Sequence, residues 1–174
     1  MYFTSESGYN GSRNASFEKA VARFYGTLFS SVRRRYPGMP LMLSPYTLDC
    51  KEKNEGMADY WCSIFSEAAP DILAPQDSIG THCTTLDAQK DLYSRWREVT
   101  RRLGCRLWAN VEIFDILLPS PGKTRLVPAS AARILAQMQN ASSFVEKLIC
   151  WEMLSMTDET FHPLGGALRE FFQR

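Results

Sequence analysis

The hydrophobic and polar positions of the chain follow two patterns that alternate along its length. Short apolar runs, each followed by polar or aromatic residues, are typical of buried strands. These runs predict strands at residues 1–6, 40–46, 71–77, 106–115 and 145–153. Within the fourth run, Asn110 and Glu112 stand two residues apart. They are therefore predicted to point to the same side of their strand, where a charged group is costly unless something requires it.

Between the strands, apolar residues recur at steps of three and four, which predicts amphipathic helices. The helical segments are residues 16–35, 56–69, 84–103, 130–140 and 164–172. In the first of them the apolar stripe comprises Phe17, Val21, Phe24, Leu28 and Val32, and we expect it to face the core. Strands recur every ~30 to 40 residues, which is the size of a βαβ unit. The chain is therefore predicted to be an α/β protein with a parallel sheet and right-handed crossovers.

Two parallel architectures fit this order of elements, an open doubly wound sheet and part of a (β/α)8 TIM barrel. A nucleotide-binding doubly wound fold carries a glycine-rich turn after its first strand, and the sequence has none. The segment PGKT at residues 121–124 lacks the remaining residues of a phosphate loop. The barrel explains more, because hydrogen-bonding and aromatic side chains end every predicted strand. Barrel enzymes have their active sites at that face.

A full barrel needs about 250 residues, whereas this chain has 174. We therefore predict a single domain over residues 1–174 that forms about half of a barrel and is truncated or completed by a partner. The first and last strands of such a half-barrel would be exposed edges, which invite pairing. The expected partner is a second copy of the chain or the missing N-terminal half of the barrel.

Composition and charge narrow the possible functions. The net charge of +1 provides no basic field for nucleic acid or anionic lipid, and no run of about 18 apolar residues would span a membrane. The five cysteines and two histidines show no metal-ligand spacing. We therefore expect no cofactor, no metal, no nucleic-acid partner and no membrane partner. The scattered cysteines indicate a cytoplasmic protein, unless a longer parent chain carries a signal peptide.

Several motifs resemble a known family. The most specific are PQDSIG at residues 75–80 and WANVEIF at residues 108–114, accompanied by SPY at 44–46 and LICWEM at 148–153. They resemble the C-terminal half of the barrel in a family of glycoside-hydrolase-like TIM barrels. This family is classified as a domain of unknown function. The family patterns are PQDGxG and WxNxExF, so Ser78 stands where the family has glycine. The resemblance runs from about Met1 to Trp151 and implies that the chain holds barrel strands four to eight.

The resemblance also implies two catalytic carboxylates. Barrel glycosidases of the large retaining clan have one catalytic glutamate after strand four and another near strand seven, and these positions match Glu6 and Glu112. Glu112 would act as nucleophile or charge stabiliser, and Glu6 as general acid/base with a raised pKa. Their carboxyl groups should lie about 5–5.5 Å apart for retention or about 6.5–9.5 Å apart for inversion. The alternatives are a structural buried carboxylate for Glu112 and a solvent-facing residue for Glu6.

Five further side chains are candidates for binding a carbohydrate substrate: Tyr46, Gln76, Asp77, Asn110 and Trp151. The amide and carboxylate groups would hydrogen-bond sugar hydroxyls, although Asp77 also suits a turn. Trp151 would stack on a sugar face or pack in the barrel. We expect a glycoside hydrolase that acts on an oligo- or polysaccharide, and no turnover by the isolated chain unless it dimerises. A non-catalytic carbohydrate-binding or assembly protein with a degenerate barrel is the alternative.

Overall fold

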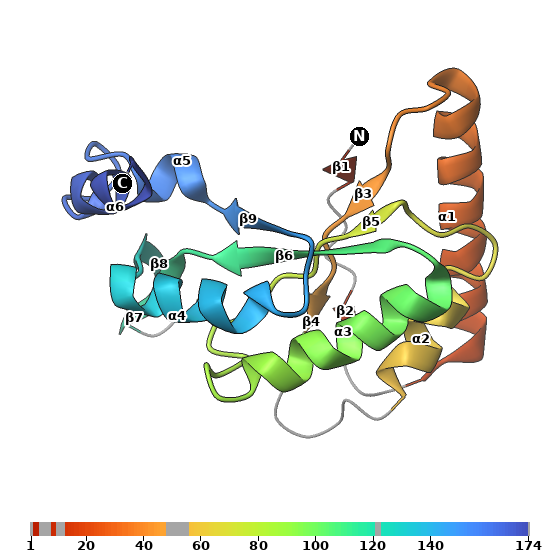
Figure 1. The fold of residues 1–174 in the computed structure, drawn as a ribbon, viewed down its shortest axis with the longest axis horizontal. Coiled ribbons are helices and arrows are strands. Elements are labelled where there is room, and N and C mark those ends of the chain that lie inside the picture. The colour runs from red at the N-terminus through yellow and green to blue at the C-terminus, as the bar shows by residue number, and fades with distance from the viewer. Residues whose placement is uncertain (1, 4–7, 10–12, 48–55, 121–122, 174) are drawn as a thin grey trace.

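The computed structural model describes residues 2–3, 8–9, 13–47, 56–120 and 123–173, in which helices and short strands alternate (Figure 1). The strands are β1 (Tyr2–Phe3), β2 (Gly8–Tyr9), β3 (Met42–Leu43), β4 (Tyr46–Thr47), β5 (Ile72–Leu73), β6 (Arg106–Glu112), β7 (Phe114–Ser120), β8 (Lys123–Pro128) and β9 (Lys147–Trp151). The helices are α1 (Ala15–Arg35), α2 (Met57–Ile64), α3 (Gln89–Leu103), α4 (Ala131–Ser142), α5 (Met153–Met156) and α6 (Gly165–Gln173). Each predicted strand segment contains a strand, and each predicted helical segment overlaps a helix.

Five of the strands form one parallel sheet in the order β1-β3-β5-β6-β9. Each strand lies beside the one that precedes it in this series, and a helix (α1, α2, α3 or α4) stands in each connection. A doubly wound sheet reverses its strand order at a switch point, but the order of the described strands never reverses. The prediction of a parallel α/β fold is confirmed, and the order is consistent with a segment of an α/β barrel.

One face of the sheet packs against the helices. Alternate side chains of β6, namely Leu107, Ala109 and Val111, enter three apolar clusters together with helix side chains. In one cluster Trp61 of α2 and Trp96 of α3 lie against the sheet with their ring centroids 5.3 Å apart. Removing this apolar surface from water is the main contribution that stabilises the fold.

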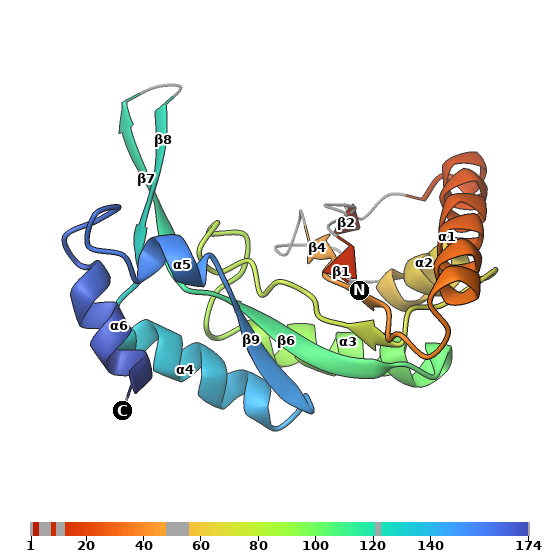
Figure 2. The same cartoon turned by 90° about the horizontal axis from the view of Figure 1, so that it is seen from above.

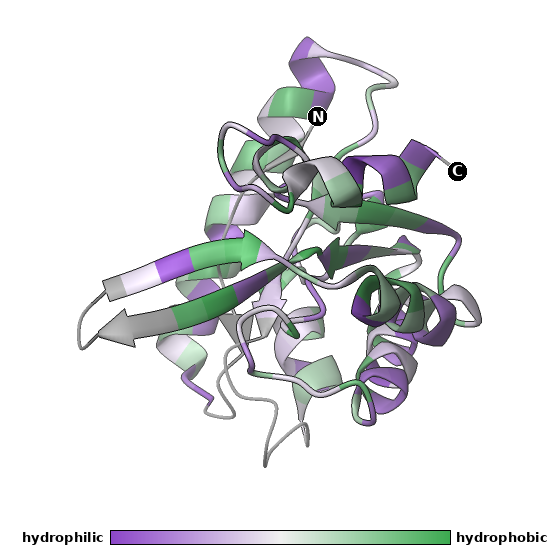
Figure 3. Ribbon diagram, turned by 90° about the vertical axis from the view of Figure 1, so that its left-hand side faces the viewer, coloured by the Kyte–Doolittle hydropathy of each residue, from purple (hydrophilic) through white to green (hydrophobic). Residues whose placement is uncertain are grey.

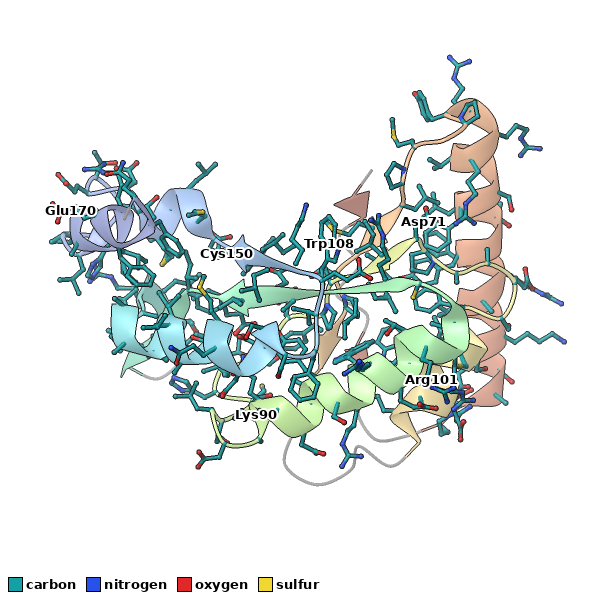
Figure 4. All side chains as sticks on the ribbon, in the orientation of Figure 1. Asp71, Lys90, Arg101, Trp108, Cys150 and Glu170 are labelled. Carbon is teal, nitrogen blue, oxygen red and sulfur yellow. The ribbon has the colours of Figure 1, made fainter. Side chains whose placement is uncertain are left out.

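The opposite face of β6 carries Trp108, Asn110 and Glu112, because side chains alternate along a strand. Trp108 lies midway along β6 (Figure 4) and is half-buried, with Lys147 Nζ 4.6 Å from its ring centroid. Asn110 and Glu112 stand at the carboxyl end of β6 and are buried. The prediction that these two residues share one side of the strand is therefore confirmed.

The apolar stripe predicted for the first helix is wrong in part. The exposed fraction is 53% for Phe17 and 59% for Phe24. The helix instead buries Tyr25 and Phe29, whose rings contact Phe65 at the end of α2. Two apolar stripes therefore run side by side along α1. The inner stripe is packed in the core, and the outer stripe keeps exposed phenyl rings on the surface.

Phe24→Gln is expected to change the free energy of unfolding by no more than about 0.5 kcal/mol, because exposed positions contribute little. It should at the same time reduce self-association, since an exposed apolar stripe promotes contact between molecules. Urea denaturation and light scattering measure the two effects. Lys19→Gln, an exposed position on the same helix, is the control and should change neither. Equal self-association of wild type and Phe24→Gln would contradict the assignment of this stripe as a contact surface.

An antiparallel hairpin, β7–β8, directly follows β6 and was not predicted. It projects on the side of β6 away from α3 and α4 (Figure 2), and both of its strands carry hydrophobic stretches, green in Figure 3. Ile116 and Leu126 pair across the hairpin and pack against an apolar cluster. Within the described residues, none of the helices has the length and apolar character needed to cross a bilayer.

Candidate functional site

The carboxyl ends of β5 and β6 bring two acidic side chains together. Parallel pairing continues beyond β5 through a bridge between Gln76 and Asn110. This register places Asp77 opposite Val111, one residue before Glu112, and the backbone N–H of Glu112 donates to Asp77 Oδ1 at 3.2 Å. Both side chains are fully buried. Two deeply buried carboxyl groups whose charges act on each other are costly unless donors satisfy them or a proton neutralises one.

Two helices supply donors to Asp77. Gln137 Nε2, on α4, donates to Asp77 Oδ2 at 2.7 Å and to the carbonyl oxygen of Glu112 at 3.2 Å. Gln89 Nε2, at the start of α3, donates to the same oxygen of Asp77 at 3.1 Å. The backbone N–H of Ile79 donates to Asp77 Oδ1 at 3.4 Å. Asp77 therefore ties the ends of two strands to two helices.

Glu112 has fewer donors than Asp77. Its Oε2 accepts the backbone N–H of Thr81 at 3.1 Å, whereas Oε1 is buried without a hydrogen-bond partner among the described residues. Burial, and next the charge of Asp77, raise the pKa of Glu112 to about 8. Burial raises the pKa of Asp77 to about 6, against the opposing effect of its donors. At neutral pH Glu112 is therefore mostly protonated and Asp77 mostly ionised.

Arg133, on α4, contributes a positive charge to this region. Its Nη2 donates to the carbonyl oxygen of Phe114. Its charge favours the ionised forms of both Asp77 and Glu112, but less strongly than burial opposes them. Burial lowers the pKa of Arg133 itself. Among the described residues, Arg133 therefore acts on both acids through its charge, without an ion pair to either of them.

A cavity of about 290 Å³ opens at this end of the sheet. Its lining residues are Tyr46, Gln76, Thr81, Phe114 and Trp151. Three aromatic rings beside neutral polar side chains suit the apolar faces and the hydroxyl groups of a sugar. Glu112 lies directly behind this lining, because it accepts the Thr81 N–H and pairs with Trp151 on the neighbouring strand.

The loop of residues 78–84 covers Glu112. Ser78 (φ 56°) and His82 (φ 61°) adopt the left-handed backbone conformation that favours glycine. This explains why the resembling pattern has glycine at position 78. A Cβ atom on Gly80 would lie 2.5 Å from a carbonyl oxygen of β7 and 3.1 Å from Glu112 Oε2, so no other residue fits there without a shift. His82 Nε2 and Asp115 Oδ1, 2.5 Å apart, bind the loop to β7.

The structure brings together most of the predicted site residues, but at different depths. Tyr46, Gln76 and Trp151 line the cavity together. Asp77 and Asn110 are buried, and Asn110 Nδ2 donates to Ser44 Oγ, between β3 and β4, at 2.9 Å. Direct contact of these two side chains with a substrate is therefore not supported by their positions.

Glu6, the second predicted catalytic residue, lies outside the described residues. Its distance from Glu112, which would separate retention from inversion, is not defined by the structure. The described acidic residue that lies beside Glu112 is Asp77, which the sequence had indicated only as a substrate contact.

Five residues of the site were not predicted from the sequence: Thr81, Gln89, Phe114, Arg133 and Gln137. A signal was present for the two glutamines. Gln137 lies between Ile134 and Ala141 on the buried stripe of α4, and Gln89 lies on that of α3. An amide on the apolar side of a helix needs a buried hydrogen-bond partner. The contact of Thr81 depends on the fold of the loop, which the sequence pattern does not specify.

The other end of the sheet holds a larger cavity, of about 800 Å³, lined in part by Arg33, Asp71 and Arg106. It lies near the carboxyl ends of α1 and α3, and Arg33 Nη2 there is paired with Asp71 Oδ1 at 3.3 Å. In barrel proteins this end serves stability rather than chemistry, so we assign the site to the smaller cavity. Within the described part of the chain, no cluster of histidine, cysteine or acidic side chains is arranged to hold a metal ion.

Comparisons with known proteins agree with this fold. The family described as a domain of unknown function, DUF4434, matches residues 1–160. No curated protein matches the sequence significantly. Among solved structures, a protein from Bacteroides thetaiotaomicron described as a "putative alpha-L-fucosidase" is similar, with a TM-score of 0.65 and 15% sequence identity. The match covers 99% of this chain and 55% of that protein, so the chain spans about half the length of this relative. The chain belongs to the DUF4434 family.

Proposed function

We propose that the protein is a glycoside hydrolase that acts on an oligo- or polysaccharide. The observation that carries the proposal is the place of Glu112, a carboxyl group directly behind an aromatic-lined cavity at the carboxyl ends of parallel strands. Barrel glycosidases act at this end of the strands, and cleavage of a glycosidic bond requires a carboxyl group as proton donor. The similarity to a glycoside-hydrolase-like fold supports the same proposal.

In this proposal Glu112 is the general acid. A pKa of about 8 keeps its carboxyl protonated at neutral pH, as a proton donor to a leaving oxygen requires. This role differs from the nucleophile or charge stabiliser expected from the family resemblance, because a protonated carboxyl is a poor nucleophile. Glu6 remains the proposed second carboxylate. Substrate that displaces the Thr81 backbone would give Glu112 Oε2 access to the cavity.

A non-catalytic carbohydrate-binding protein is the second candidate. One observation favours it: Glu112 is fully buried, and the described lining of the cavity contains no acidic side chain. Binding alone needs only the aromatic rings of Tyr46 and Trp151 and the amide of Gln76.

We propose further that these strands are strands four to eight of a (β/α)8 barrel, and that the open edge of the sheet is covered in the active protein. The sheet ends at β1 and β9, and unpaired strand edges attract a partner. The exposed Phe17 and Phe24 of α1 add an apolar contact surface. A second copy or additional βα units would provide the cover, since the similar Bacteroides protein extends well beyond the matched part.

Hydrolysis of a panel of aryl glycosides and oligosaccharides tests the proposed function. The protein is assayed as a monomer and at concentrations at which light scattering shows an oligomer, and sugar binding is followed by the fluorescence of its tryptophans. We expect turnover by the oligomer and none by the monomer. Saturable sugar binding without hydrolysis in either form would support the second candidate. Neither binding nor hydrolysis in the oligomer would contradict both.

A further inference from the structure

We propose that Asp77 is a positioning residue that holds Glu112 in place and, by its own negative charge, keeps the proton on Glu112. This inference rests on the proposed function, because it explains how the general acid is kept in its acid form. It assigns different states to the two buried carboxyl groups: Asp77 is the anion and Glu112 the proton carrier. Asp77 is not a catalytic residue in this scheme, since it is buried away from the cavity lining.

The hydrogen bonds of Asp77 show how the position of Glu112 is fixed. Asp77 Oδ1 accepts the backbone N–H of Glu112, and Gln137 bridges Asp77 Oδ2 and the Glu112 carbonyl oxygen. The backbone N–H and the backbone carbonyl of Glu112 are thus both bound within one network. With the backbone held in this way, the side chain has little freedom to leave the carboxyl end of β6.

The hydrogen bonds also favour different protonation states in the two acids. Asp77 receives four donors, two on each oxygen, and donors to a carboxylate stabilise its ionised form. Glu112 accepts the backbone N–H of Thr81 on Oε2, and the backbone N–H of Gly80 also favours its anion, while Oε1 has no partner among the described residues. When only one of the two acids is protonated, the proton is therefore more stable on Glu112. Interacting carboxyl groups with different environments are separated into acid and base in this manner.

The other titratable groups described around the pair do not change which acid carries the proton. Within the described part of the chain, the titratable and charged side chains that interact with one or both acids are Tyr46 on β4, Tyr93 on α3, Arg133 on α4 and Cys150 on β9. The pKa values of Tyr46, Tyr93 and Cys150 are raised, mainly by burial, so these groups are neutral below pH 9. Arg133 acts on both acids in the same direction.

The test measures the protonation of Glu112 directly and needs no activity. The carboxyl carbons of the glutamates are labelled with ¹³C, and the Glu112 signal is assigned by its absence in Glu112→Gln. In wild type this signal should titrate near pH 8, with a smaller step near pH 6 when Asp77 ionises. In Asp77→Asn the main titration should move down by about one pH unit and the small step should disappear. Asp91→Asn, an exposed position on α3, should leave both unchanged.

A folded Asp77→Asn protein with an unchanged Glu112 titration would overturn the proposal. If that variant does not fold, the wild-type curve decides: a single step at or below about pH 4.5, with no coupling to a second acid, overturns the proposal equally. These results are independent of the enzyme assay. A coupled pair in a protein without hydrolase activity would keep Asp77 as the positioning residue and remove only the proposed reaction.

Discussion

Glu112→Gln is expected to lower the rate constant of glycoside hydrolysis by about 10²- to 10⁴-fold, which is the usual contribution of a general acid. The amide has nearly the shape of the protonated carboxyl and can still accept the Thr81 N–H, but it cannot deliver a proton to the leaving oxygen. The loss should therefore fall on kcat rather than on the affinity for substrate. Initial rates measured on the oligomer over a range of substrate concentrations separate the two parameters.

The choice of leaving group makes this prediction sharper. An aryl glycoside with a good leaving group, such as a dinitrophenolate, needs little protonation, so Glu112→Gln should retain much more activity towards it than towards an oligosaccharide. Glu146→Gln is the matched control, because Glu146 is exposed before β9, at the opposite end of the sheet. An equal loss for both kinds of substrate would indicate that Glu112 has another role than acid.

The parallel fold could be predicted because each apolar run and each helical stripe reports local burial. The lengths of the strands could not. The segment predicted at residues 71–77 pairs as a regular strand only over Ile72 and Leu73, since Pro75 has no N–H to donate and pairing returns only at Gln76. The third helix was expected from residue 84 but begins at Gln89, because the N–H groups of residues 83 and 84 bind the carbonyl oxygen of Ser78 in the preceding loop.

The hairpin was missed although its signal was present. The segment at residues 121–124 lacks the rest of a phosphate loop, and a Pro-Gly pair between two apolar runs is also a turn signal. The outer face of α1 was misjudged for a different reason. Both Phe24 and Tyr25 belong to an apolar stripe with helical spacing, and only the packing against α2 decides which of them is buried.

At the candidate site, the sequence indicated several of the residues that lie together but not how they combine. The motifs placed Gln76, Asp77 and Glu112 at the ends of strands, where the structure has them. Pairing Asp77 with Glu112 requires the register between two strands that are more than 30 residues apart in the sequence. The amide of Gln137 comes from yet another element. Long-range contacts of this kind depend on the whole fold, so a local pattern cannot specify them.

The stability of the wild-type protein is expected to fall as the pH rises from about 4.5 to 8, and Glu112→Gln should remove most of this dependence. The pKa of Glu112 is raised from 4.5 to about 8 in the folded state, so in this window the folded protein binds a proton that the unfolded chain has released. Ionisation then favours unfolding, by about 1.4 kcal/mol for each pH unit between the two pKa values. Asp77 adds a smaller effect in the same direction that ends near pH 6.

The difference between the two proteins isolates this effect, because every other titrating group is common to both. Urea denaturation at several pH values between 5 and 9 gives the free energy of unfolding of each. The curves should diverge up to about pH 8 and run parallel above it, where Glu112 is ionised in both states. Glu18, whose pKa is lowered by Arg13, has the opposite sign and acts below this window. Parallel curves throughout would mean that Glu112 is already ionised at pH 5, which is incompatible with its role as the acid.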